Sequence, residues 1–420
     1  MCGENEYLLR QVLRNEWDFD GFTICDFVWG VKDTVASASS GLDIEMPITH
    51  FYGEKLLEVV REGEVTEQTI DESALRIIRT LLAHEHFIEE HKKEGSCDYR
   101  KHQELALQCA REEITLLKNE DQLLPIDCKK RKKIVVLGSY ADRENIGDRG
   151  SSQVYAPYVV TILQGITEYP SDAEVIYYSE ESASHCRRLA KEADVVVIVA
   201  GNDYLDAVVV LVGGSMILMD EWEDRVGAIL MAYYPGMEGG KAVADVLFGK
   251  TNPGGKLPFV IPKKKEDLPE IDWDAEEFRY DYYHGYTLLN KSHVKPLYPF
   301  GYGLSYTTFT LAGMKAWRDE ENLYASVIAK NTGKREGSEV VQMYVGAADS
   351  KVERPEYVLK DFQKIRLDAG EEKEVKLVCP IREMAYFDEG RNEFVAEFSI
   401  PYEVYVGTSS LREELWVRKV

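Results

Sequence analysis

The sequence GFTICDFVWG, residues 21–30, and the sequence GLDIEMP, residues 41–47, decide how the first part of this chain folds. Both are short apolar runs with a carboxylate near the end, and strands are expected at residues 22–27 and 42–46. Residues 31–39 between them have a helical composition. A strand, a helix and a strand, with an acid at the carboxyl end of each strand, is how an α/β barrel presents catalytic groups.

Asp26 closes the first of these strands and is followed by two aromatic residues, Phe27 and Trp29. This combination suits sugar chemistry, because a carboxylate can attack or stabilise an oxocarbenium-like carbon while aromatic rings pack on the sugar's C–H face. A strand-end aspartate can equally well cap the following helix, so a structural role stays open. For Glu45, at the end of the second strand, the expected role is a structural salt bridge at the barrel rim.

The rest of residues 1–90 is helical in pattern. Helices are expected after Asn5, over residues 52–61, and from Thr66 to Leu82. A complete (β/α)₈ barrel needs about 250 residues. Residues 1–90 are therefore expected to be a piece of such a barrel, or a smaller fold of their own.

A polar, glycine-containing linker is expected at residues 91–101, before a domain of a different kind. Apolar runs without alternation follow, separated by helical segments such as 182–192, as in parallel strands that are covered on both faces. Residues 102–262 are therefore predicted to form a three-layer α/β sandwich. Its expected strands are 134–137, 195–199, 208–212 and 228–233.

The last third of the chain changes pattern again. Residues 263–298 are charged and aromatic without clear periodicity, which indicates a connector. Residues 299–420 contain short alternating strands separated by turn signals, which is typical of an antiparallel β-sandwich of the fibronectin type III-like kind. The predicted fold class is α/β plus all-β: a partial (β/α)₈ barrel, an α/β sandwich and a β-sandwich.

Composition limits the function classes. The net charge of −24 argues against nucleic acid and anionic membranes as partners, because both would be repelled. Seven cysteines without CxxC pairs argue against a disulfide framework and a zinc site, and the eight histidines show no metal-ligand spacing. No metal or cofactor is therefore expected. Neither a signal peptide nor a membrane-spanning run is visible, so the predicted compartment is the cytoplasm.

A glycine-rich loop, GDRGSS at residues 147–152, follows a strand of the second domain. It lacks the Lys-Ser/Thr ending of a P-loop and the spacing of a dinucleotide fingerprint, and Asp148 would repel phosphate. A loop that faces a substrate or another domain is the better interpretation. No Gly-x-Ser-x-Gly nucleophile elbow is present.

Taken together, the motifs of this chain resemble glycoside hydrolase family 3, the β-glucosidase type. The resemblance covers nearly the whole chain. One departure lies at the nucleophile motif, where the family has Ser and Trp on either side of the acid and this chain has Cys25 and Phe27. The matching segments are 21–27, 36–47, 147–152, 234–240, 249–258 and 298–309.

The resemblance implies that residues 1–90 are the C-terminal part of a (β/α)₈ barrel and that Asp26 is the nucleophile of a retaining mechanism, in which a glycosyl-enzyme forms and water resolves it. It also implies that Phe27, Trp29 and Arg149 contact the sugar. The implied substrates are carbohydrates with terminal β-D-glucosyl residues.

The family's acid/base glutamate usually lies in a loop after a valine-rich strand of the second domain. Here the valine-rich strand runs directly into GNDYLD, residues 201–206, and the next strand follows at once. The loop and the helix after it therefore look deleted, and no acid/base residue is identifiable. Asp203 or Asp206 would be a replacement, but nothing in the sequence supports either.

The leading hypothesis is a family 3-like β-glucosidase that is truncated at the N-terminus and internally, with little or no hydrolysis by the isolated chain. One alternative is a non-catalytic carbohydrate-binding or assembly module. Another is one half of a split enzyme, completed by a separate barrel fragment, because a partial barrel leaves strand edges unpaired. Homo-oligomers are a further possibility for the same reason.

Overall fold

The computed structural model describes residues 2–91, 99–147, 153–179, 182–199, 207–270, 272 and 282–420. The chain divides into two compact units, residues 1–97 and 98–420, which are described separately.

The first unit is mainly helical. A helix follows Asn5 as expected, the π-helix η2 (Tyr7–Glu16), and the Asn5 Oδ1 accepts a hydrogen bond from the Leu8 amide in its first turn at 3.1 Å. Thr66 begins the last one, which continues beyond the expected end at Leu82. The helical elements are η1 (Cys2–Glu4), the π-helix η2 (Tyr7–Glu16), α1 (Thr34–Ser40), α2 (Glu54–Arg61) and α3 (Glu67–His91).

The two strands expected in this unit are much shorter than predicted. Among the described residues, they are reduced to one parallel bridge between Ile24 and Ile44. The Cys25 amide donates to the Ile44 carbonyl at 3.0 Å, and the Ile44 amide donates to the Thr23 carbonyl at 3.1 Å. A parallel pair without strands on its outer sides has few hydrogen bonds to keep the backbone extended, so only the centre of each apolar run pairs.

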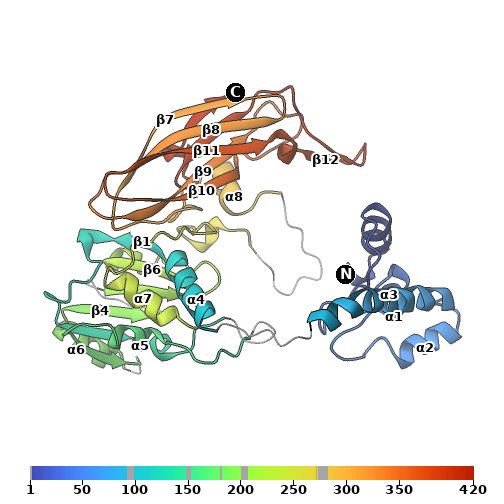
Figure 1. Cartoon of the computed structure of the whole chain (residues 1–420), viewed down its shortest axis with the longest axis horizontal. Helices are drawn as coiled ribbons and strands as arrows, with labels where there is room; N and C mark the ends of the chain where they lie inside the picture. Colours follow the sequence, from blue (N-terminus) through green and yellow to red (C-terminus); the bar gives the residue numbers. More distant parts are fainter. Residues whose placement is uncertain are drawn as a thin grey trace. The chain divides into compact units, whose positions relative to one another are not determined.

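The first part of the second unit contains a six-stranded sheet in the order β1-β6-β5-β4-β2-β3 (Figure 1). All neighbours are parallel except β1, an antiparallel edge strand. The four strands predicted from apolar runs are confirmed. The strands are β1 (Thr115–Asn119), β2 (Lys133–Leu137), β3 (Glu174–Tyr178), β4 (Val195–Val199), β5 (Ala207–Val212) and β6 (Ala228–Tyr233).

Both faces of this sheet are covered, which explains why its strands are apolar at every position. Val197 packs into the core formed with α4 (Tyr99–Glu113), α5 (Ile162–Thr167) and α7 (Gly239–Leu247). Ile198, the next residue, packs into the opposite core, to which α6 (Ala183–Glu192) contributes Cys186. The three-layer prediction is therefore confirmed.

The end of the second unit is an antiparallel β-sandwich, as predicted. Its sheets have the orders β10-β9-β14-β15 and β11-β8-β7, and the core lies between them. A two-stranded hairpin, β12-β13, is separate. The strands are β7 (Phe309–Arg318), β8 (Asn322–Asn331), β9 (Gly337–Gly346), β10 (Val358–Leu367), β11 (Glu372–Pro380), β12 (Tyr386–Asp388), β13 (Glu393–Val395), β14 (Glu403–Gly407) and β15 (Trp416–Lys419).

Short helical elements lie in the connections of the second unit. The connector before the sandwich includes the helix α8 (Gly285–Lys291). The 3₁₀ turns are η3 (Glu120–Gln122), η4 (Ser139–Asp142), η5 (Glu223–Arg225), η6 (Lys265–Asp267), η7 (Ile381–Met384) and η8 (Arg412–Glu414).

Two of the family-like motifs join the α/β sandwich to the β-sandwich. Asn252 Oδ1 accepts hydrogen bonds from the Ser305 hydroxyl at 2.9 Å and the Tyr306 amide at 2.8 Å. Lys256 forms an ion pair with Glu339 of β9 at 2.6 Å. The motifs around Asn252 and Tyr306 are therefore structural in this chain, because they hold the α/β sandwich and the β-sandwich of the second unit together.

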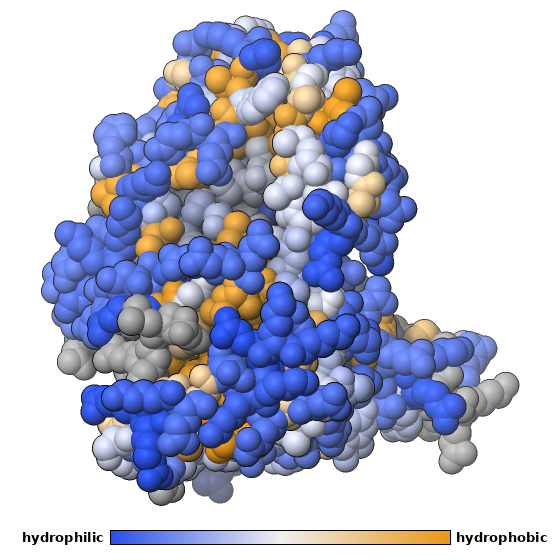
Figure 2. Space-filling model, turned by 90° about the vertical axis from the view of Figure 1, so that its left-hand side faces the viewer, coloured by the Kyte–Doolittle hydropathy of each residue, from blue (hydrophilic) through white to orange (hydrophobic). Residues whose placement is uncertain are grey.

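Figure 2 shows one face of the molecule, and that face is largely hydrophilic. On the face drawn in Figure 2, blue residues predominate and orange, hydrophobic residues are interspersed among them. No helix that the structure describes is long and apolar enough to cross a lipid bilayer.

Candidate active site

Asp26 lies directly after the strand bridge, in a tight turn. The Gly30 amide donates to the Asp26 carbonyl at 2.9 Å, and the Val28 amide donates to the Met46 carbonyl at 3.0 Å. Val28 has φ of 69°, a left-handed conformation that a β-branched residue rarely adopts. Such a conformation persists only where the surrounding contacts impose it, and it is a recognised feature of functional turns.

Gly30 makes this turn possible. A Cβ atom at position 30 would lie 2.5 Å from the Asp26 amide nitrogen and 2.6 Å from its carbonyl oxygen. A side chain at position 30 would therefore displace the backbone that positions Asp26.

The Asp26 side chain is exposed, and no hydrogen bond or ion pair joins its carboxylate to a residue that the structure describes. The alternative that Asp26 caps the following helix is wrong. That position belongs to Asp33, whose Oδ1 accepts from the Ala36 amide at 2.7 Å. The Asp26 carboxylate is thus available to a ligand.

The two aromatic residues of the turn are exposed as well. Phe27 is 51% and Trp29 is 67% exposed. The Lys32 ammonium lies 5.1 Å from the centre of the Trp29 ring, so one face of that ring carries a cation. The surface beside Asp26 therefore offers aromatic faces on which a sugar ring can pack.

Glu45 is structural, but not through the expected salt bridge. Its carboxylate accepts backbone hydrogen bonds from His50 at 3.1 Å, Phe51 at 3.0 Å and Tyr52 at 2.8 Å. Burial acts to raise the pKa of Glu45, but the three amide donors outweigh it and hold the pKa below its usual value. A carboxylate fixed in this way is a poor proton donor.

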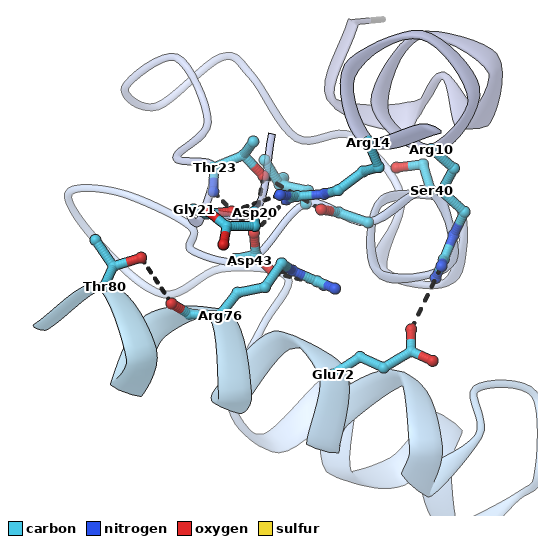
Figure 3. A network of polar contacts seen from close by, with 12 residues as sticks. Arg10, Arg14, Asp20, Gly21, Thr23, Ser40, Asp43, Glu72, Arg76 and Thr80 are labelled. Carbon is cyan, nitrogen blue, oxygen red and sulfur yellow. Dashed lines mark hydrogen bonds and ion pairs between the residues drawn. The ribbon is translucent and has the colours of Figure 1, made fainter. Parts of the chain in front are cut away.

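A buried carboxylate that sequence reasoning missed organises this unit. The side chain of Asp43 is fully buried, and its two oxygens are bound by Arg14 of η2 at 3.0 Å and Arg76 of α3 at 2.7 Å. The Thr23 amide donates to it at 2.8 Å. Figure 3 shows Asp43 between the two arginines, which come from different elements. Burial and the nearby Arg76 lower the pKa of Arg14.

The remaining predicted residues cannot be placed beside Asp26. Arg149, Asp203 and Asp206 lie outside the described residues. The strands on either side of Asp203 and Asp206 are parallel neighbours, with Val197 of β4 paired to Val208 of β5. Only residues 200–206 connect them, whereas such a crossover usually takes a dozen or more residues and a helix.

No cluster of metal-binding side chains occurs among the described residues.

A second candidate site lies in the second unit, between the α/β sandwich and the β-sandwich. It is a cavity of about 440 Å³ whose mostly apolar wall includes Tyr233, Phe300 and Phe362. Glu113, at the end of α4, also faces it, and no hydrogen bond or ion pair joins its carboxylate to a described residue. Burial raises the pKa of Glu113 to about 7.

Three family models match this chain. The glycosyl hydrolase family 3 N terminal domain matches residues 1–80, and the fibronectin type III-like domain matches residues 339–410. The glycosyl hydrolase family 3 C-terminal domain matches in two pieces, residues 114–207 and 204–306. The two pieces meet at the short connection between β4 and β5.

Curated relatives match along almost the whole chain. Thermostable beta-glucosidase B of Acetivibrio thermocellus is 34% identical over 97% of this chain and 60% of its own length. Beta-glucosidase BoGH3A of Bacteroides ovatus is 31% identical over 97% of this chain and 65% of its own length. The chain therefore spans less than two thirds of these relatives.

Solved structures match along the whole of this chain. Beta-glucosidase 3B of Thermotoga neapolitana in complex with glucose superposes with a TM-score of 0.83 at 30% identity, over 100% of this chain and 68% of that protein. A beta-glucosidase of Bifidobacterium adolescentis superposes with a TM-score of 0.84 at 29% identity, over 67% of its length.

Proposed function

Because this chain belongs to glycosyl hydrolase family 3, we propose that it carries the nucleophile of a retaining β-glucosidase and that Asp26 is that nucleophile. One observation carries the proposal: the Asp26 carboxylate is exposed without a described partner, whereas the carboxylates of Asp43 and Glu45 are both occupied. The names of the relatives, which are beta-glucosidases, support the substrate class.

In the proposed reaction, an oxygen of Asp26 bonds to the anomeric carbon of a β-glucosyl unit as the bond to the leaving oxygen breaks. The leaving oxygen keeps the electron pair and takes up a proton. Water then attacks the anomeric carbon and gives its proton to a base, and the Asp26 carboxylate is released. Phe27 and Trp29 would pack on the sugar.

A second carboxyl group, about 5 Å from the nucleophile, normally donates the first proton and removes the second. No described residue is assigned to this role. General acid–base catalysis contributes about 10²–10⁴-fold. We therefore propose that the isolated chain hydrolyses glucosides with poor leaving groups, such as cellobiose, very slowly or not at all.

Leaving-group chemistry tests this function. A dinitrophenolate leaves without protonation, so dinitrophenyl β-glucoside needs the nucleophile but no acid. The expected result is slow hydrolysis of this substrate, acceleration by azide (which attacks without a base), and no measurable cellobiose turnover. Asp26→Asn should abolish the slow reaction. Asp18→Asn, at another exposed acid of the same unit, is the matched control and should leave it unchanged.

Two outcomes would contradict the proposal. Turnover of dinitrophenyl β-glucoside that persists in Asp26→Asn would exclude Asp26 as the nucleophile. Efficient cellobiose hydrolysis by the isolated chain would show that an acid/base residue is present after all.

The cavity of the second unit favours a second candidate function, non-catalytic carbohydrate binding. Its aromatic wall and the Glu113 carboxyl group are the groups that sugars use for stacking and hydrogen bonding. Calorimetric titration with glucose and cello-oligosaccharides should then show binding that Phe362→Ala weakens. No heat of binding at millimolar sugar would exclude this candidate.

We also propose that the protein acts in the cytoplasm, without nucleic-acid or membrane partners. Two facts support this: none of the described cysteines forms a disulfide, and the chain carries a net charge of −24. Cell fractionation with antibody detection tests the compartment.

A further inference from the structure

A groove runs between two helices of the α/β sandwich, α5 and α7, which cover the same face of the sheet (Figure 1). The two helices begin together, since the Gly240 amide donates to the Val160 carbonyl at 3.0 Å. They also end together, where the Tyr169 ring stacks on Phe248 with 4.3 Å between the ring centres. The groove between them, called here the α5–α7 groove, holds a cavity of about 570 Å³. Its walls include Tyr158, Glu168, Tyr169, Glu238, Lys241 and Asp245.

Small residues keep this groove hollow. The backbones of α5 and α7 touch, because a Cβ atom at Gly165 would lie 2.0 Å from the Gly240 carbonyl oxygen. Beside this contact, Gly165 and Ala244 line the cavity with little or no side chain. The lining extends along α7, whose nine residues span about 13 Å. The cavity is therefore longer than one sugar ring, and its volume lies in the range of small-molecule sites, about 300–1,000 Å³.

The carboxylate of Glu238 is buried but only half satisfied. The residue is 6% exposed, and its Oε1 accepts a hydrogen bond from the Tyr158 hydroxyl. No hydrogen bond or ion pair joins its Oε2 to a residue that the structure describes, and this oxygen still has contact with solvent. Because buried polar groups are normally hydrogen-bonded, the Glu238 Oε2 is an acceptor left open to the cavity.

Further hydrogen-bonding groups of both signs line the groove. Lys241 and Glu168 are exposed, and no hydrogen bond or ion pair joins either charged group to a described residue. The carboxylate of Asp245, in contrast, is already bound by Arg111 and, at 3.2 Å, by Lys250. A ligand in the groove therefore meets free carboxylate acceptors and a free ammonium donor.

Two tyrosine rings mark the ends of the groove. Tyr158 is 40% exposed beside Glu238. Tyr169 lies at the other end, and Phe248 covers one face of its ring. The uncovered ring faces can pack against the C–H face of a sugar.

We propose that the α5–α7 groove binds a neutral β-linked oligosaccharide of two or three pyranose units. A hydroxyl group both donates and accepts hydrogen bonds, so a row of sugar hydroxyls matches carboxylates and an ammonium in one cavity. The two tyrosine rings add stacking at either end, and the length of the groove exceeds a single ring. The site belongs to the second unit, and the inference does not depend on the proposed role of Asp26.

Other classes of ligand fit this groove less well. A phosphate group would face the carboxylates of Glu168 and Glu238, and a polyamine would face the ammonium of Lys241. A metal ion needs several oxygen ligands around one point, and the described part of the chain holds no cluster of three metal-binding side chains.

Calorimetric titration of the full chain with cellotriose, a β-linked glucose trimer, tests the proposal. We expect saturable binding that Glu238→Gln and Lys241→Ala each weaken by about tenfold, the effect of losing one hydrogen bond to a charged group. Lys241 is exposed, so Lys241→Ala should keep the far-UV circular dichroism and the urea midpoint of the wild type even if Glu238→Gln is less stable. Glu174→Gln, at an exposed acid of β3, is the matched control and should bind cellotriose like the wild type.

A second titration separates the groove from the cavity between the two sandwiches. In Phe362→Ala, which removes an aromatic wall of that cavity, binding that depends on Lys241 should persist. Binding that is lost in Phe362→Ala and unchanged in Lys241→Ala would place the sugar in the other cavity and overturn the proposal.

Three further results would overturn the proposal. They are no heat of binding at millimolar cellotriose, wild-type affinity in Lys241→Ala, and competition by inorganic phosphate or spermidine, which would indicate recognition of charge. Asp26→Asn should bind cellotriose like the wild type. None of these results changes the dinitrophenyl glucoside test, so failure of this inference and failure of the proposed function are distinguishable.

Discussion

At the residue scale, three carboxylates of the first unit differ through their surroundings. Asp26 is exposed, Asp43 is buried between two arginines, and Glu45 is bound by three backbone amides. In the sequence, Asp26 and Glu45 look alike, since each ends an apolar run. The amides that bind Glu45 come from a turn at residues 50–52, a local geometry that composition does not reveal.

Asp43→Asn should destabilise the first unit by about 3–5 kcal/mol, because it leaves Arg14 and Arg76 close together without a counter-charge. Loss of amide protection in α3, measured by hydrogen exchange, would report the change. Asp20→Asn provides the control, since the Asp20 ion pair with Arg79 is exposed and its loss should have little effect. Equal effects of the two substitutions would contradict the central role of Asp43.

Glu113 should make the stability of the second unit depend on pH. Burial raises its pKa from 4.5 to about 7, so the folded state holds the proton more tightly than the unfolded state. Stability should therefore fall as the pH rises from about 4.5 through 7 and stay low above it. Glu113→Gln should raise the denaturation midpoint at pH 8 and much less at pH 4.5. If the difference in denaturation midpoint between Glu113→Gln and the wild type does not change with pH, the raised pKa of Glu113 is contradicted.

At the element scale, apolar periodicity predicted the sheet of the second unit well and the strands of the first unit poorly. The strands β2, β4, β5 and β6 are covered on both faces, so their uniform apolar pattern reflects their true surroundings. The runs around Ile24 and Ile44 have the same pattern, but strand length depends on neighbouring strands that a single segment does not encode.

Gly255 should be required where the segment after α7 crosses the end of α4. A Cβ atom there would lie 2.1 Å from the Glu113 carbonyl oxygen, which is backbone and has little room to move. Gly255→Ala is expected to destabilise the second unit by roughly 1–3 kcal/mol or more, as measured by urea denaturation. Gly213→Ala is the matched control, because its nearest contact is an ordinary 3.7 Å to Ile217, and it should change the stability by less than about 0.5 kcal/mol. If Gly255→Ala leaves the stability in urea unchanged, the segment after α7 can move away from the end of α4, and Gly255 is not required there.

At the scale of the whole molecule, the two units differ in how much core they possess. The second unit has large cores on both faces of its sheet and inside its sandwich, whereas the first has one small cluster around Cys25, Val31 and Leu42. Sequence motifs identified the family and the fold class. They did not reveal the apolar surface of the first unit, because exposure depends on which segments are present to cover each side chain.

Hydrogen exchange should show this difference directly. Amides of β4, β5 and β6 are expected to exchange through global unfolding of the second unit, and amides of α2 and α3 orders of magnitude faster. Equal protection of both units in the isolated chain would contradict the view that the first unit lacks a sufficient core.

The central claim, that Asp26 is a glycosidase nucleophile, is tested most directly by trapping the glycosyl-enzyme. The measurement is peptide mass spectrometry after incubation with dinitrophenyl 2-deoxy-2-fluoro-β-glucoside, whose covalent intermediate hydrolyses slowly. The account predicts one fluoroglucosyl group on the peptide that contains Asp26, and none in Asp26→Asn. A label on another carboxylate, or an unlabelled Asp26 peptide after prolonged incubation, would contradict it.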